Sequence, residues 1–200
     1  MTVSSLVAAV RRPPAFRLLL TALLGVAAGG PPARADEGNR LIDYAGFARQ
    51  VAEVGALRES RRVSEEEFLE LARDPATVIL DARSAEKYRL LHVRGARNLS
   101  LPDMTEAELA AIIPDKRTRV LIYCNNNFEN EVRAFPEKTI RASLNVHTFN
   151  LLHAYGYENV HELKPLLDVA TTRIPFAGEL AERPRAAGPG SGVPAGTGIR

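Results

Sequence analysis

The chain has 200 residues, 46% of them apolar, which is enough for one globular domain with a hydrophobic core. Its 26 basic and 24 acidic residues nearly balance, and no basic run is interleaved with aromatic residues, so nucleic-acid binding is not expected. The single cysteine excludes a framework of internal disulfides.

The first 35 residues have the layout of a signal peptide. Three arginines precede an apolar run of 12 residues at 18–29, and Ala33-Arg34-Ala35 provides a small-x-small cleavage site. The run is shorter than the roughly 20 residues of a spanning helix, so we expect no stable membrane anchor. Cleavage near Ala35 would release an exported protein, periplasmic or extracellular, and change its formal charge from +2 to −2.

Four helices are predicted in chain order. Apolar residues recur at three- and four-residue steps over 41–57, which indicates an amphipathic helix. Ser64 with Glu67, and Thr105 with Glu108, have the spacing of capping boxes at helix starts. We therefore expect helices at 41–57, 65–72, 106–113 and 144–154.

Short β-branched and aliphatic runs predict strands that alternate with these helices, at 77–80, 96–101, 120–123 and 159–163. The strands are almost continuously apolar, which is typical of a parallel sheet covered on both faces. The predicted fold class is therefore α/β, with a parallel sheet flanked by helices on both faces and preceded by an N-terminal helix. From Ala181, five glycines and three prolines indicate a flexible tail.

Cys124 follows the predicted strand 120–123 directly, and therefore lies at the carboxyl end of a strand, where parallel sheets place ligands. Asn125, Asn126 and Asn127 come next. Asparagine tolerates positive φ, so we expect this triplet to curl the backbone around the sulfur with its amides pointing inward. Such a concave site favours a thiolate, a persulfide or a bound oxyanion. The alternative is an inert, buried core thiol.

Four segments carry recognisable motifs, and they follow one another from residue 61 to residue 163. They read RRVSEEEFLELARDPATVILDARSAEKY, HVRGARNLSL, VLIYC and AYGYENVHEL. In this order they resemble the rhodanese-like family. We therefore expect a signal peptide at 1–35, an N-terminal helical segment at 36–61, a rhodanese-like domain at 62–168, and an extension with a flexible tail at 169–200.

The resemblance implies a sulfurtransferase. In that family the cysteine takes a sulfur from a donor such as thiosulfate or a polysulfide. It holds that sulfur as a persulfide and passes it to a thiol or cyanide; no cofactor is implied. Cys124 inherits the catalytic role. The same resemblance gives a substrate-binding role to Asn125, Asn126, Asn127, Phe128 and Arg83, with Asp81 and His92 as structural support. For Asp81 and Arg83 a structural ion pair is favoured over a direct catalytic role.

The loop after Cys124 departs from the family because it runs on for many residues before the helix at 144–154. Glu129 and Glu131 lie where a basic residue would help to hold an anionic donor, unless they pair with Arg133, Lys138 or Arg141.

An alternative function is therefore a noncatalytic module that senses oxidants or binds a protein partner. The partner would contact the loop from Glu129 to Arg141, with Phe128, Phe135 and Arg141 as candidate contacts.

Two further chemistries are not supported. Phosphatases of this fold carry an arginine six residues after the cysteine, and Asn130 occupies that position here. His147, His153 and His161 lack the spacing of metal ligands, so no metal site is expected. The sequon Asn98-Leu99-Ser100 lies in a predicted strand, and we expect it to be unused.

Overall fold

Five parallel strands form the central sheet of residues 39–181, the part of the chain that the computed structural model describes. Their order is β1-β7-β5-β2-β4, so β5 is the middle strand. The strands are β1 (Arg62–Val63), β2 (Val78–Asp81), β4 (Arg97–Asn98), β5 (Val120–Tyr123) and β7 (Val160–Leu163). The predicted parallel sheet is confirmed. The predicted signal peptide at 1–35 and nearly all of the predicted tail lie outside the described residues.

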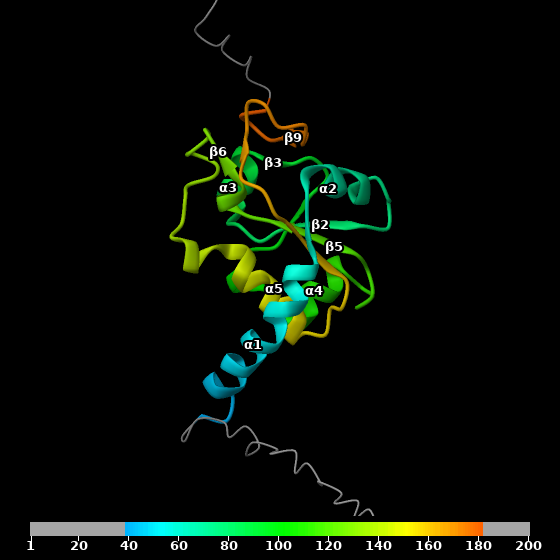
Figure 1. Cartoon of the computed structure of the whole chain (residues 1–200), viewed down its shortest axis with the longest axis vertical. Coiled ribbons are helices and arrows are strands. Elements are labelled where there is room, and N and C mark those ends of the chain that lie inside the picture. Colours follow the sequence, from blue (N-terminus) through cyan, green and yellow to red (C-terminus); the bar gives the residue numbers. More distant parts are fainter. Residues whose placement is uncertain (1–38, 182–200) are drawn as a thin grey trace, which may run out of the picture. The chain divides into compact units, whose positions relative to one another are not determined.

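Helices cover both faces of this sheet, as predicted. They are α1 (Tyr44–Ser60), α2 (Glu65–Ala72), α3 (Ala85–Leu90), α4 (Glu106–Ile112) and α5 (Leu144–Ala154). Figure 1 shows α2 and α3 on one side of the sheet and α1, α4 and α5 on the other. Side chains alternate along β5, so Leu121 belongs to the core with Phe68 of α2, whereas Ile122 belongs to the core with Phe149 of α5.

Side-chain caps fix where α1 and α2 begin. At α2 the capping box is present in both directions, because the Ser64 amide donates to Glu67 Oε2 at 2.8 Å and the Glu67 amide donates to Ser64 Oγ at 3.2 Å. At α1 the Gly46 amide donates to Asp43 Oδ1 at 2.7 Å, so the helix begins at Tyr44, three residues later than the apolar periodicity indicates. Capping geometry, rather than periodicity, locates a helix start.

The apolar face of α1 is only partly covered. Val54 is its one buried residue, and it packs in the core with Phe149 of α5. Tyr44 and Phe47, in the first turns of the helix, are exposed. No helix within residues 39–181 has both the length and the apolar character that crossing a bilayer requires.

Short elements outside the main sheet tie the later chain to the domain. They are β3 (His92–Val93), β6 (Phe128–Glu129), β8 (Leu167–Asp168), β9 (Phe176–Ala177) and the 3₁₀ turns η1 (Leu101–Asp103), η2 (Asn125–Asn127) and η3 (Ile140–Ala142). β3 pairs antiparallel with β9, and β6 pairs parallel with β8. Ile174 and Phe176 are buried, so the C-terminal extension packs against the domain at least as far as these residues.

Candidate active site

Cys124 lies at the carboxyl end of β5, in the middle of the sheet. Its side chain is buried, with 1% of the residue exposed, and its Sγ is 3.3 Å from Ser143 Oγ. It lines a cavity of about 570 Å³. The cavity wall comes from the end of α1, from the loop after β5, from the start of α5 and from the region of β7. All four residues from Asn125 to Phe128 also line it.

The asparagine triplet turns the chain, but not in the predicted way. Asn125–Asn127 form the 3₁₀ turn η2, closed by a hydrogen bond from the Asn127 amide to the Cys124 carbonyl at 3.2 Å. Within the described residues the non-glycine residue with positive φ is Asn130, at 67°. The expectation of positive φ in the triplet is therefore wrong, because a right-handed 3₁₀ turn already reverses the chain.

The side chain of Asn127 joins three parts of the site. Its Oδ1 accepts from the Cys124 amide and from Asn145 Nδ2, both at 2.9 Å. Its Nδ2 donates to the carbonyls of Leu163 at 2.8 Å and Pro165 at 3.1 Å. Asn127 thus fixes the backbone of Cys124 to the end of β7 and to the first turn of α5.

Asn125 and Asn126 hold the long loop that follows. Asn125 Nδ2 donates to the Pro136 carbonyl at 2.8 Å. Asn126 bonds the backbone of Lys138 in both directions, through Nδ2 at 2.6 Å and Oδ1 at 3.1 Å. Their side chains therefore bind loop backbone.

Phe128 and Phe135 belong to the core. Their rings lie 4.7 Å apart, and Phe128 also contacts the Phe176 ring edge to face at 5.1 Å. Both residues are almost completely buried, so they cannot be the loop's exposed contacts for a partner. The exposed apolar side chains of the loop are Val132 and Ile140.

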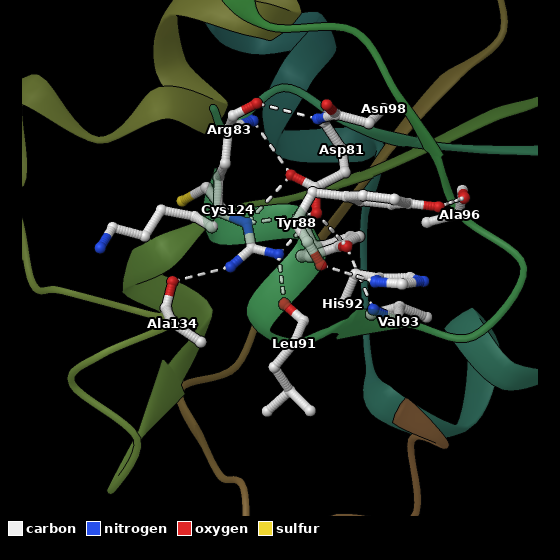
Figure 2. Close-up of polar contacts among 12 residues, drawn as sticks. Asp81, Arg83, Tyr88, Leu91, His92, Val93, Ala96, Asn98, Cys124 and Ala134 are labelled. Atoms are coloured by element: carbon white, nitrogen blue, oxygen red, sulfur yellow. Dashed lines mark hydrogen bonds and ion pairs between the residues drawn. The ribbon is translucent and has the colours of Figure 1, made fainter. Parts of the chain in front are cut away.

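The ion pair between Asp81 and Arg83 is present and fully buried (Figure 2). Arg83 Nη2 lies 2.6 Å from Asp81 Oδ2 and donates to the Leu91 carbonyl at 2.7 Å, while Nη1 donates to the Ala134 carbonyl at 2.9 Å. Arg83 is not among the residues that line the Cys124 cavity. The structure therefore places it apart from the other residues predicted to bind substrate.

Tyr123 completes this buried group. Its hydroxyl donates to Asp81 Oδ2 at 2.5 Å and accepts from the Val93 amide at 3.1 Å. Burial and the adjacent Asp81 carboxylate raise the pKa of Tyr123 well above its ordinary value, so the phenol stays neutral. Burial opposes the charge of Arg83, but the hydrogen bonds and charge of Asp81 raise the pKa of Arg83 overall. The buried group of Asp81, Arg83 and Tyr123 therefore contains one ion pair and one neutral hydrogen-bond donor, the Tyr123 hydroxyl.

His92 and Asn98 lie beside the same group in Figure 2. The His92 ring stacks on Tyr88 at 3.8 Å, and its Nδ1 is 2.7 Å from the Tyr88 carbonyl oxygen. Asn98 Nδ2 donates to the carbonyls of Asp81 and Arg83, both at 2.9 Å. The side-chain nitrogen of the sequon thus bonds two backbone carbonyls.

The alternative in which the loop carboxylates pair with loop cations is not seen within residues 39–181. Among the described ion pairs, none joins Glu129 or Glu131 to a loop cation, and Glu131 Oε1 instead accepts from the Arg133 amide at 3.2 Å. Glu129 lines the Cys124 cavity together with Glu137.

Several residues of the cavity were not predicted from the sequence: Arg58, Arg62, Ser143, Asn145 and Glu162. Glu162 gives a sequence signal, because it is a carboxylate inside a short strand, β7, whose other residues are buried or half-buried. The other four residues give no such sequence signal, because only the folding of the chain brings them close to Cys124.

Comparison with known proteins identifies the family. Residues 64–165 match the model of the rhodanese-like domain, and the chain belongs to that family. Over 95 residues it is 41% identical to the thiosulfate sulfurtransferase PspE of Escherichia coli K12, an alignment that covers 48% of this chain and 76% of that protein.

Two solved structures are also similar. A rhodanese-like domain from Anabaena sp. has 20% identity and a TM-score of 0.46, covering 70% of this chain and 96% of its own. A rhodanese with anions from E. coli has 23% identity and a TM-score of 0.35, covering 52% and 99%.

Proposed function

We propose that this protein is a sulfurtransferase that carries a sulfane sulfur as a persulfide on Cys124. The observation that supports this most is the position of the cysteine. It lies at the carboxyl end of the middle strand and lines a cavity large enough for a small sulfur donor. The relative named thiosulfate sulfurtransferase suggests thiosulfate as the donor.

The proposed reaction has two displacements. The Cys124 thiolate attacks the outer sulfur of thiosulfate, a new S–S bond forms, and the S–S bond of the donor breaks as sulfite leaves with the electron pair. Cyanide or a thiolate then attacks the outer persulfide sulfur and leaves as thiocyanate or a new persulfide, which restores the Cys124 thiolate. Neither step needs a second cysteine or an external oxidant, which agrees with the single cysteine of the chain.

Ser143 supports negative charge on the sulfur. It occupies the N-cap position of α5, but its hydroxyl forms no capping hydrogen bond and lies beside Cys124 Sγ instead. A hydroxyl in that place can donate to a thiolate or a persulfide. The amino-terminal end of α5, which carries partial positive charge, begins at the same residue.

The amides of Asn125 and Asn126 are the proposed remainder of the cradle. The amides of Asn127 and Phe128 are used inside the turn, where they donate to the carbonyls of Cys124 and Asn125. The first amides of a helical turn have no acceptor within it. We therefore assign the anion-binding role to the first two amides of η2 rather than to all four from Asn125 to Phe128.

Intact-mass spectrometry tests the proposal. After incubation with thiosulfate the protein should gain the mass of one sulfur atom, and Cys124→Ser, the matched control, should gain nothing. Adding cyanide should return the wild type to its starting mass with release of thiocyanate. An unchanged wild-type mass would reject sulfur transfer from thiosulfate.

The second candidate is a noncatalytic partner-binding module. The exposure of Val132 and Ile140 on the long loop favours it, because exposed apolar side chains next to a cavity are frequent in protein interfaces. Under this function the thiol should be alkylated slowly and the mass should not change. Export after cleavage near Ala35 is proposed for either function, and sequencing the amino terminus of the mature protein tests it.

A further inference from the structure

Two arginines that precede the family-matched segment line the Cys124 cavity. Arg58 lies in the last turn of α1, and Arg62 begins β1, whereas the rhodanese-like match begins at residue 64. Arg58 pairs with Glu162 of β7, and Arg62 lies between Glu162 and Glu59 of α1. They therefore bring positive charge to the site from outside the segment that carries the family motifs.

Strand register explains how they reach the cysteine. Arg62 lies beside Glu162 across β1 and β7, and Glu162 lies beside Ile122 across β7 and β5. Residues in register on parallel strands point to the same face, and residues two apart on an extended chain do so as well. Cys124 is two residues beyond Ile122 and has an extended backbone. Arg62, Glu162 and Cys124 thus share the face that α5 covers.

Glu162 holds the guanidinium group of Arg58 and contacts that of Arg62, which is also held by Glu59 at 3.2 Å. The side chain of Glu162 is only 4% exposed, and its Oε1 lies 2.5 Å from Arg58 Nη2 and 3.9 Å from Arg62 Nε. Arg58 Nε is buried and has no hydrogen-bond partner among residues 39–181. The arginine side chains are 23% and 26% exposed, so they are both anchored and open to a ligand.

The charges around the cavity are divided between its walls. On the sheet side, Arg58, Arg62 and Lys164 line the cavity together with the carboxylate of Glu162. Arg62 also pairs with the exposed Glu59, which does not line the cavity, so the lining on this side carries more positive than negative groups. Glu129 and Glu137 lie on the loop side and are exposed. Water and salt screen exposed carboxylates more strongly than partly buried guanidinium groups. An anion that enters the cavity should therefore settle at the sheet side.

We propose that Arg58 and Arg62 bind the anionic end of the sulfur donor and select small anionic donors, such as thiosulfate through its sulfonate group, over neutral ones. This rests on the proposed sulfurtransferase function. The two arginines would also supply the positive charge that the loop lacks, since Glu129 and Glu131 stand there where a basic residue would help to hold an anionic donor. Glu162 acts as a positioning residue, because its carboxylate fixes Arg58 in the cavity.

Alkylation of Cys124 by an anionic and a neutral reagent tests this subsite without sulfur chemistry. Iodoacetate and iodoacetamide both form a bond from Sγ to carbon and release iodide, but only iodoacetate carries a charge. In the double variant Arg58→Gln/Arg62→Gln, the ratio of the iodoacetate rate to the iodoacetamide rate should fall about tenfold. The KM for thiosulfate should rise by about tenfold or more.

Arg61→Gln is the matched control, because it removes one positive charge next to Arg62 from a residue that does not line the cavity. Its rate ratio should stay within about twofold of the wild type. The neutral reagent reports whether a variant keeps its folded cavity. Arg62→Gln alone provides a second, milder variant, because it removes the contacts of Arg62 to Glu59 and Glu162 but keeps the Arg58–Glu162 pair.

Each outcome has a definite meaning. A ratio that falls no more in the double variant than in Arg61→Gln would overturn the anion subsite. A wild-type thiol that reacts with neither reagent would overturn it too, because no anion could then reach Cys124. A ratio that falls as expected while thiosulfate adds no sulfur would support the subsite and reject the proposed transfer from thiosulfate.

Discussion

Asn127 is the residue on which the geometry of the site depends most. Its amide makes four hydrogen bonds, two as acceptor and two as donor, and so uses its full capacity. The two carbonyls that it faces also determine the orientation of the amide, since only Nδ2 can donate to them. The neighbouring Asn145 must then turn its own Nδ2 toward Asn127 Oδ1.

Asn127→Asp therefore tests the site at the residue scale. The substitution keeps the shape but places a carboxylate against the carbonyls of Leu163 and Pro165, where two donors are lost. We expect the free energy of unfolding, measured with urea, to fall by about 3 to 5 kcal/mol, as for an uncompensated buried charge.

Asn126→Asp is the matched control, because Asn126 is less buried and donates to one carbonyl only. Its cost should be about 1 kcal/mol. Equal losses in the two variants would contradict the central role of Asn127.

Residue types at the site were predictable only in part. Local sequence predicts three features of the site: the position of Cys124, the asparagine turn and the Asp81–Arg83 pair. Each of them depends on neighbours within a few positions in the chain. Ser143, Asn145 and the two arginines of the cavity depend on the packing of α1 and α5 against the sheet. No local pattern encodes such contacts, which explains why they were missed.

Among the elements, the C-terminal segment with β9 is held through backbone contacts at Gly178. This glycine has φ of +112°, and an added Cβ would lie 2.8 Å from the Leu90 carbonyl oxygen and 2.9 Å from that of Arg89. The amides of Glu179 and Leu180 donate to the same two carbonyls. A side chain at Gly178 would thus separate this segment from the end of α3.

Gly178→Ala should lower the free energy of unfolding by about 2 to 4 kcal/mol, from backbone strain and overpacking together. Gly95→Ala separates the two causes, because Gly95 also has positive φ, at +85°, but has no atom within 4 Å of the added Cβ. It should cost about 1 to 2 kcal/mol. Urea unfolding of both variants measures the difference, and a smaller loss at Gly178 than at Gly95 would refute the contact argument.

The elements with strong local signals were predicted well. α2 and α5 have the predicted bounds, and each predicted main-sheet strand overlaps an observed one, because capping pairs and apolar runs determine them locally. The two-residue strands β1, β3, β6, β8 and β9 were not predicted. Two residues carry no periodicity, and their pairing is determined by distant chain segments.

For the whole molecule, His161 links stability to pH. Burial, and then the charges of Arg61 and Arg119, lower the pKa of His161 below its ordinary value of 6.5. The unfolded chain therefore binds this proton more tightly than the folded protein does. The contribution of His161 to stability should be fully present above pH 6.5 and should be lost as the pH decreases through 6.5 toward the lowered pKa.

Urea unfolding at a series of pH values, from about pH 8 to about pH 5, measures this dependence. His161→Gln should remove the part of the decrease that begins near pH 6.5, because the neutral amide cannot gain a proton. Identical slopes in the wild type and His161→Gln would disprove the assignment.

The burial of Cys124 bears on the lifetime of a stored sulfur. A persulfide loses its outer sulfur to any nucleophile that reaches it, so its half-life depends on access. Only 1% of Cys124 is exposed, and the cavity of about 570 Å³ in front of it is walled by the loop that follows β5. Cyanide and small thiols fit a space of this volume, and because the sulfur is buried we expect them to reach it more readily than a cysteine on a folded protein surface would. Under the proposed chemistry the protein would act as a reservoir that discharges to acceptors according to their size.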